Sequence, residues 1–128
     1  MRGTKYSILV AKDKGAVIGM VELGLNDRAS SMRLPTIGLI CVLHGYRGKR
    51  IGEALVQRCV EIASRDWMED RLVADVAEDN ENAQNFFTSI GFRSDGEREM
   101  VQTKVGRETV VKPHIVFYLP LDNRTITD

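Results

Sequence analysis

The sequence predicts one α/β domain in which a mixed, mostly antiparallel sheet is flanked by helices. Three observations predict it: short β-rich runs, two segments with helical spacing of apolar residues, and the order in which these alternate. That order is ββ–β–α–β–α–β–β, which is typical of a single α/β domain. A chain of 128 residues, 43% hydrophobic, suits one core. We therefore expect one domain over residues 1–128, with its core at about 5–121.

The first expected strands form a hairpin followed by a third strand. Tyr6–Lys12 and Ala16–Leu25 are β-rich runs, and Asp13-Lys14-Gly15 between them is a hairpin signal. Asn26–Pro35 is polar and is expected to be a loop. Thr36–Leu43 is a nearly continuous apolar run of strand length, which predicts burial on both faces.

A helical pattern begins at Ile51 and continues to about Arg65. Glu61 and Arg65 form an i,i+4 pair in the favourable orientation. Arg71–Ala77 then reads as another buried strand. The apolar face of the helix consists of Ile51, Leu55, Cys59 and Ile62.

A second, shorter helix follows, and either Asp79 or Asn80 is expected to cap it. Its apolar positions have the spacing i, i+3, i+4, i+7 and are Ala83, Phe86, Phe87 and Ile90. Gly91 suits the left-handed position that ends a helix, and Phe92 would pack back on Phe87. The last two strands are expected at Glu97–Thr103 and Pro113–Leu121, joined by a polar segment.

The overall composition narrows the class of function. Lys plus Arg (18) balances Asp plus Glu (18), so no global field favours nucleic acid or a membrane surface as a partner. Cys41 and Cys59 lack a CxxC spacing and are expected to be small buried residues. No signal core or transmembrane span is evident, and no metal site is expected. These features favour the cytoplasm.

The segment between the third strand and the first helix has the character of an anion site. Three glycines (Gly45, Gly48 and Gly52) let the backbone approach a ligand closely, and Arg47, Lys49 and Arg50 add three positive charges. The first N–H groups of a helix have no partner within the helix and carry the positive end of its dipole, so they hold phosphate well. A solvated charge run is the simpler alternative, but the flanking glycines and the following helix favour phosphate.

Two common nucleotide motifs do not fit this loop. No Ser or Thr follows Lys49 to hold magnesium, as a P-loop requires. The GxGxxG pattern is also missing, and no acidic residue ends a strand about 20 residues on to bind a ribose. Nucleoside triphosphate and dinucleotide ligands are therefore disfavoured.

Two segments instead resemble the GNAT N-acetyltransferase superfamily, over roughly Lys5–Leu121. Arg47–Gly52 is similar to the loop that binds the pyrophosphate of acyl-CoA, written Q/R-x-x-G-x-G/A. Asn80–Phe92 is similar to the second CoA-contacting segment, N-x-x-A-x-x-x-Y-x-x-x-G-F. Both occur in the expected order, with a strand between them. The resemblance implies acetyl-CoA as co-substrate and a primary amine, on a small molecule or a peptide N-terminus, as acceptor.

The resemblance also implies which residues bind acetyl-CoA. Strand residues near Val42 would hold the pantetheine arm and, through the Val42 N–H, the oxyanion of the thioester carbonyl. The loop amides would hold the pyrophosphate. The implied set is Cys41, Val42, Leu43, Arg47, Gly48, Lys49, Arg50, Ile51, Gly52, Glu53, Asn80, Ala83, Phe86 and Phe87.

Two positions depart from the family pattern. Arg50 replaces the middle glycine of the loop motif; we expect it in right-handed helical geometry, where it adds charge beside the phosphates. Phe87 replaces the tyrosine that usually protonates the departing thiolate. Because general acid catalysis contributes about 10²–10⁴-fold and a thiol with a pKa near 8.5 leaves readily, we expect slower catalysis rather than none.

A third departure is at the N-terminus, where the chain begins at the hairpin rather than at the family's usual strand and two helices. The acceptor side is then open, completed by a second subunit in a homodimer, or missing from a fragment. The base is also open, because Gly38 stands where the family often has a carboxylate. Candidates are Glu22, Glu78, His44 and His114.

Without an evident base, the site should favour amines of low pKa, such as a peptide N-terminus, an amino sugar or an aromatic amine. The sequence thus predicts direct acetyl transfer from acetyl-CoA to a primary amine. One alternative is a CoA-binding domain with little or no activity, and another is a binder of a different phosphate ligand. Cys41 as an acyl-carrying nucleophile is disfavoured, since nothing positions a base beside it.

Overall fold

The computed structural model of the chain describes residues 5–27 and 33–121. It divides into two compact units, one of residues 1–72 with 120–128 and the other of residues 73–119. Six strands and two α-helices lie in the described ranges, in the predicted order. The α/β class is therefore confirmed.

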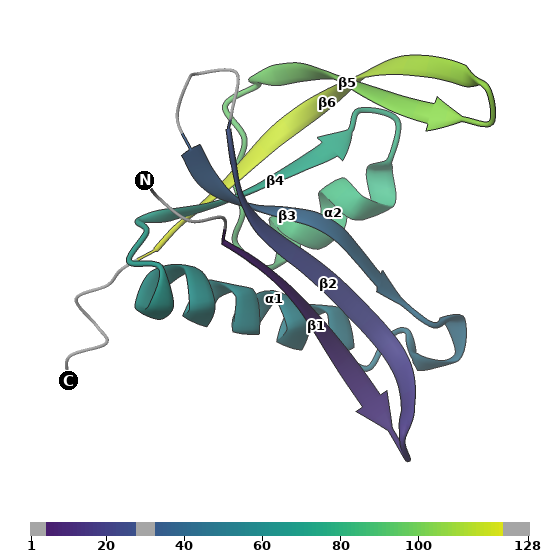
Figure 1. The fold of residues 1–128 in the computed structure, drawn as a ribbon, viewed down its shortest axis with the longest axis vertical. Coiled ribbons are helices and arrows are strands. Elements are labelled where there is room, and N and C mark those ends of the chain that lie inside the picture. Colours follow the sequence, from purple (N-terminus) through teal and green to yellow (C-terminus); the bar gives the residue numbers. More distant parts are fainter. Residues whose placement is uncertain (1–4, 28–32, 122–128) are drawn as a thin grey trace. The chain divides into compact units, whose positions relative to one another are not determined.

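The first unit contains three antiparallel strands in the order β1 (Tyr6–Asp13), β2 (Ala16–Asp27) and β3 (Arg33–Val42) (Figure 1). The β1–β2 turn has positive φ at both Lys14 (50°) and Gly15 (83°). That is the pattern of a type I′ turn, whose twist matches that of the strands it joins. The hairpin predicted from Asp13-Lys14-Gly15 is confirmed.

The loop predicted over Asn26–Pro35 is wrong at both ends, because β2 runs to Asp27 and β3 starts at Arg33. Residues 28–32 in its middle lie outside the described part of the chain. Pro35 is tolerated inside β3 for a reason of register. It lies opposite Leu25, whose own N–H donates to the carbonyl of Lys5, the residue before β1, at 3.0 Å. Leu25 and Pro35 are therefore a pair that forms no hydrogen bond between β2 and β3. The proline, which has no N–H, removes no hydrogen bond from the sheet at this position.

Strand β3 changes character halfway along. Leu34 to Ile37 are buried, but Gly38, Leu39 and Cys41 are exposed, so the prediction of burial on both faces is wrong for its second half. The register shifts here: Leu23 lies opposite Ile37 and Val21 opposite Ile40. Two residues of β3, at 38 and 39, thus oppose Glu22 alone, which is a β-bulge.

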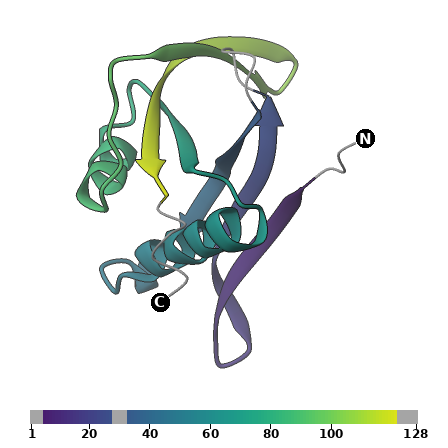
Figure 2. The ribbon, with the colours of Figure 1, turned by 90° about the vertical axis from the view of Figure 1, so that its left-hand side faces the viewer.

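Helix α1 (Ile51–Glu61) covers one face of β2 and β3 (Figure 2). The predicted apolar face is confirmed for Leu55, Cys59 and Ile62, which are buried. The pattern predicted to reach Arg65 ends in a π-helical turn, Ile62–Asp66, in which the Trp67 N–H donates to the Ile62 carbonyl at 3.0 Å.

The second unit contains most of β4 (Arg71–Ala77), α2 (Glu81–Ser89), β5 (Arg98–Val105) and β6 (Glu108–Pro120). Strands β5 and β6 form a long antiparallel hairpin with Gly106-Arg107 as its turn. The polar segment predicted to join them therefore mostly belongs to the strands. Thr109, Val111 and Lys112 are exposed because they lie in a solvated ribbon, not because they are a loop.

Helix α2 begins and ends as its sequence predicts. The Asn80 side chain accepts a hydrogen bond from the Ala83 N–H at 3.1 Å, so Asn80 is the cap. Gly91 has a φ of +105°, as expected for the residue that ends the helix. The ring of Phe87 packs edge-on against Phe92, with centroids 5.1 Å apart.

Candidate coenzyme loop and acceptor face

The chain leaves β3 in a tight 3₁₀ turn at His44–Tyr46. The Leu43 N–H donates to Ile18 of β2 at 2.8 Å, and the Tyr46 N–H donates back to Leu43 at 2.9 Å. The Arg47 N–H then donates to the His44 carbonyl at 3.2 Å. This turn fixes the path of the backbone up to the start of α1.

Beyond this turn, the backbone presents a run of unpartnered N–H groups. The first hydrogen bond of α1 runs from the Ala54 N–H to the Arg50 carbonyl at 3.1 Å. In the described ranges, no hydrogen bond uses the four N–H groups of residues 50–53. Because a helix N-terminus carries partial positive charge, these four groups can hold an anion.

Arg50 caps this helix in an unusual conformation. Its φ and ψ are 62° and 23°, the left-handed region, and its side chain makes no capping hydrogen bond. Our prediction of right-handed geometry is therefore wrong. The backbone here has the shape for which the family uses glycine, and a non-glycine residue costs about 1–2 kcal/mol in it. Gly48, with a φ of +80°, takes the other left-handed position of the loop.

The three basic side chains of the loop are exposed, and two of them contact neighbours in the same unit. The Arg47 Nε donates to the Val42 carbonyl at 3.4 Å, and the Lys49 ammonium lies 5.5 Å from the centre of the Tyr46 ring. The Tyr46 hydroxyl donates to Asp13 at 2.7 Å, and this hydrogen bond raises the pKa of Tyr46. The loop is thus fastened to the β1–β2 hairpin while its charges face solvent.

The end of β3 directs part of its backbone away from β2. Since the Leu43 N–H points to β2, the neighbouring Val42 N–H points to the opposite side of β3. Cys41 is exposed, contrary to prediction, because its side chain lies on the face of the sheet opposite to α1. Cys59, inside α1, is buried as predicted, and burial raises the pKa of its thiol to about 12.

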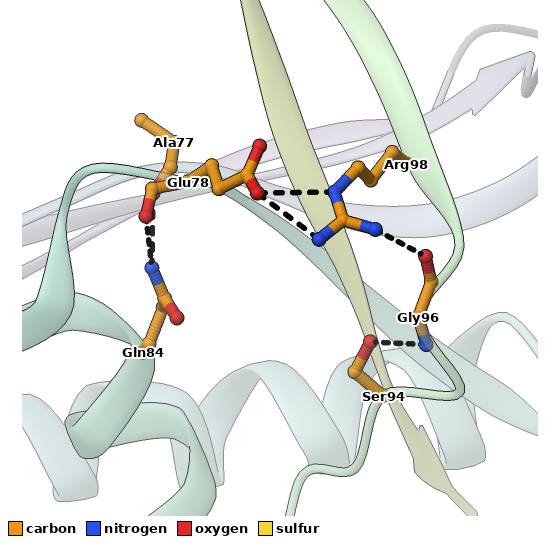
Figure 3. Close-up of polar contacts among 6 residues, drawn as sticks. All are labelled: Ala77, Glu78, Gln84, Ser94, Gly96 and Arg98. Carbon is orange, nitrogen blue, oxygen red and sulfur yellow. Dashed lines mark hydrogen bonds and ion pairs between the residues drawn. The ribbon is translucent and has the colours of Figure 1, made fainter.

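The second unit contains the other predicted coenzyme-contacting segment, Asn80–Phe92, and its Asn80 and Gln84 side chains are hydrogen-bonded to backbone groups of the same unit. Asn80 caps α2, and the Gln84 Nε2 donates to the carbonyls of Ala77 (3.3 Å) and Glu78 (2.8 Å). Figure 3 shows that the Glu78 carboxylate is also held, by the Arg98 Nε (3.2 Å) and Nη2 (3.0 Å). As a candidate base, Glu78 is therefore bound in an ion pair.

Phe87 is buried and lies between two other rings. Phe86 and Phe92 both meet it edge-on, each with a centroid distance of 5.1 Å. Such pairs stabilise a core beyond the area they bury. The ring offers packing and no proton donor.

Glu22, another candidate base, lies in the first unit beside Gly38, the position where the family often has a carboxylate. A Cβ added to Gly38 would lie 3.7 Å from the Glu22 Cβ and 3.9 Å from its Oε1. The Tyr6 hydroxyl donates to the Glu22 carboxylate, and this bond raises the pKa of Tyr6. A carboxylate from β2 thus borders the space that a side chain on β3 would fill.

His44 and His114 differ in their surroundings. His44 is exposed in the 3₁₀ turn, and its carbonyl, rather than its ring, is what the turn uses. The His114 Nδ1 lies 3.2 Å from the Asp75 Oδ1, and both side chains are largely buried. This pairing explains an acidic residue inside a predicted buried strand. The sequence could not reveal it, because the two residues are 39 positions apart.

The described residues contain neither a metal site nor a membrane-spanning helix. No described group of three His, Cys, Asp or Glu side chains could hold a metal ion. Within residues 5–27 and 33–121, the helices are too short or too polar to cross a membrane.

The family model described as "Acetyltransferase (GNAT) family" matches residues 2–92. This chain therefore belongs to the GNAT acetyltransferase family. It is 28% identical over 123 residues to the L-amino acid N-acyltransferase MnaT of Escherichia coli, covering 96% of this chain and 69% of that protein.

Solved structures agree on the fold. The structure of smu.2055 from Streptococcus mutans matches with a TM-score of 0.70 at 25% identity, covering 91% of this chain and 71% of the other. The structure of yncA from Salmonella typhimurium with its cofactor acetyl-CoA has a TM-score of 0.69 at 24% identity, with coverages of 91% and 65%. The spermidine/spermine N-acetyltransferase SpeG of Vibrio cholerae has a TM-score of 0.68 at 17% identity, with coverages of 96% and 69%.

Proposed function

We propose that this protein transfers the acetyl group of acetyl-CoA to a primary amine by direct attack of the amine on the thioester. The observation that carries this proposal is the run of four unpartnered N–H groups at residues 50–53, beside three exposed cations. A diphosphate is the part of the coenzyme that such a site fits. Arg47, Lys49 and Arg50 would supply charge-assisted contacts to it.

Val42 would bind the acetyl end of the coenzyme. Its N–H is directed away from β2, so it can donate to the carbonyl oxygen on which negative charge develops. When bound, acetyl-CoA supplies an activated acyl group whose C–S bond breaks as the C–N bond to the amine forms. The Arg47 guanidinium, hydrogen-bonded to the Val42 carbonyl, ties the pyrophosphate loop to this point of the strand.

Glu22 would take the proton that the amine loses. Of the candidates, Glu78 is already paired with Arg98, while Glu22 is held by a neutral phenol and borders the empty space at Gly38. A carboxylate there can bind the ammonium form of the acceptor and pass its proton to water. Tyr6 would orient the carboxylate through its hydrogen bond.

A coenzyme-binding protein with little transferase activity is the second candidate. It is favoured by Phe87, which is buried among rings and has no proton to give to a departing thiolate. The thiol of the coenzyme leaves readily at neutral pH without an acid, since its pKa is near 8.5. We therefore place the transferase first.

Calorimetry with CoA, acetyl-CoA and ATP tests the binding half of the proposal. We expect CoA and acetyl-CoA to bind and ATP to bind at least tenfold more weakly. Equal binding of ATP would instead indicate a general phosphate site. Chromatographic detection of the N-acetyl product across a panel of amines tests the transfer half. Binding without product from any amine would establish the second candidate.

The matched pair Glu22→Gln and Glu78→Gln tests the base. We expect the first to lower kcat by about 10²-fold, in the range of general base catalysis, and to move the acid limb of the pH–rate profile. The second should lower stability slightly by breaking the Arg98 pair and leave that limb unchanged. An unchanged pH profile in Glu22→Gln would remove Glu22 from the mechanism.

A further inference from the structure

Strands β1 to β3 present an exposed apolar face with one charged group in it. On β1, Tyr6, Ile8 and Val10 alternate toward solvent, with exposures of 54%, 53% and 47%. Directly opposite on β2 lie Gly24, Glu22 and Met20, and opposite Met20 on β3 lies Cys41. We call this surface the open face; it consists of Tyr6, Ile8, Val10, Met20, Glu22 and Cys41.

The charge on this face is isolated. Across the three paired stretches Tyr6–Val10, Met20–Gly24 and Ile37–Cys41, Glu22 is the one charged residue. Its carboxylate accepts from Tyr6, and on the β3 side it meets the bare backbone of Gly38. A ligand can therefore approach Glu22 over Gly38 while its remaining atoms lie on apolar side chains.

We propose that the open face binds the acceptor, and that the acceptor is a monoamine carried on an apolar or aromatic body. This inference rests on the proposed function and adds the class of substrate. The ammonium group would contact Glu22, and the body would lie over Ile8, Val10 and Met20. Charge complementarity selects the amine, and the exposed apolar area selects the body.

The same surface disfavours two other classes of amine. A free amino acid would bring its own carboxylate beside Glu22, in a place where the paired stretches supply no cation to balance it. A polyamine would bring second and third ammonium groups onto apolar side chains that offer no second carboxylate. Each misplaced charge must lose water without a partner, which weakens binding.

The matched acceptors 2-phenylethylamine and L-phenylalanine, which differ by one carboxylate, test the inference. We expect kcat/KM for 2-phenylethylamine to exceed that for L-phenylalanine and for spermidine by at least about tenfold. Calorimetry of 2-phenylethylamine on the protein saturated with CoA gives a second readout that needs no turnover. A preference for L-phenylalanine or spermidine, or no binding of 2-phenylethylamine to the CoA complex, would overturn the inference.

Variants on the open face locate the site. Gly38→Val should raise KM for 2-phenylethylamine about tenfold by filling the approach to Glu22, with the Kd for acetyl-CoA unchanged. Ile8→Asn should raise KM severalfold, whereas the control Val105→Asn, at an equally exposed strand position in β5, should not. If neither Gly38→Val nor Ile8→Asn changes KM, the amine binds elsewhere.

Two outcomes separate this inference from the proposed function. If acetyl-CoA binds and another amine class is acetylated best, the open face is not the acceptor site and the transferase assignment stands. If acetyl-CoA does not bind, the transferase assignment fails. A concentration-dependent dimer that Ile8→Asn converts to a monomer, with amine kinetics unchanged, would mean that a second copy of the chain covers this face instead.

Discussion

The two α-helices begin in opposite ways. At the start of α2, the Asn80 side chain accepts the Ala83 N–H, and the first turn carries Glu81. At the start of α1, Arg50 makes no capping bond. One N-terminus is thus satisfied from within the chain, and the other is left open beside three cations.

The comparison shows which of the two family segments can act as the main anion site. Every helix N-terminus carries the positive end of its own dipole and a set of N–H groups with no partner within the helix. Each first turn carries one acidic residue, Glu53 in α1 and Glu81 in α2, so the difference lies in the internal cap, which satisfies α2 and lets that segment support the fold. An uncapped start with excess positive charge remains available to a phosphate.

The largest expected effect comes from placing a carboxylate at the uncapped start of α1. In Arg50→Asp the new carboxylate lies at the helix start, competes for the open N–H groups and removes a cation. We expect the Kd for acetyl-CoA to rise at least about 100-fold, since a charged hydrogen bond is lost and a repulsion gained. Calorimetry measures the change.

The control for this variant is Arg107→Asp, which makes the same charge change in the β5–β6 turn. It should alter the Kd by less than about twofold, because Arg107 belongs neither to the loop at residues 47–50 nor to the start of α1. Similar losses in both variants would mean that net charge, and not the open helix start, governs binding.

The next effect concerns the capped helix. Asn80→Ala removes the acceptor for the Ala83 N–H and should lower the free energy of unfolding by about 1 kcal/mol. Asn80→Asp keeps an acceptor and should be nearly neutral. Urea titration measures both. A loss of acetyl-CoA affinity in both variants, without a loss of stability, would make Asn80 a ligand contact.

A smaller gain in stability is expected from Arg50→Gly. Glycine adopts a φ of 62° without strain, so the free energy of unfolding should rise by about 0.5–1 kcal/mol. The acetyl-CoA affinity should fall only severalfold, because the open N–H groups remain. A lower melting temperature would show that the left-handed conformation at Arg50 carries no strain.

Phe87→Tyr should have the smallest effect. Tyrosine, with a pKa near 10, is a weaker acid than the thiol it would protonate, so kcat should change by about threefold or less. Steady-state kinetics measure kcat, and thermal unfolding checks that the variant is folded. A gain above about tenfold would mean that thiolate protonation limits turnover by the unsubstituted protein.

Local patterns predicted much of the fold. The I′ turn at Lys14-Gly15, the cap at Asn80 and the stop at Gly91 each depend on the chemistry of a few neighbouring residues. The extents of β2, β3 and β6 were missed, because strand pairing overrode local polarity. Pro35 in particular is acceptable only through the register that β2 imposes.

The part of the candidate site that is contiguous in the sequence was predictable, and the part that joins distant residues was not. The loop between Val42 and Glu53 is contiguous, so glycines, cations and the following helix predicted an anion site. The left-handed conformation at Arg50 was missed because it depends on how the 3₁₀ turn delivers the chain to α1. The pairs Glu22–Gly38 and Asp75–His114 join distant residues through register, which spacing alone does not fix.

The bulge opposite Glu22 has a consequence for how such chains are compared across evolution. At this β-bulge, two residues of β3 oppose one residue of β2. A side chain from either strand can therefore occupy the space between Glu22 and Gly38. A carboxylate can then be absent from one alignment column and present in another while it occupies the same position in space. Homologues with glycine at the position of Gly38 should carry an acidic residue at the position of Glu22. A search for active family members that inspects only the Gly38 position would miss such homologues.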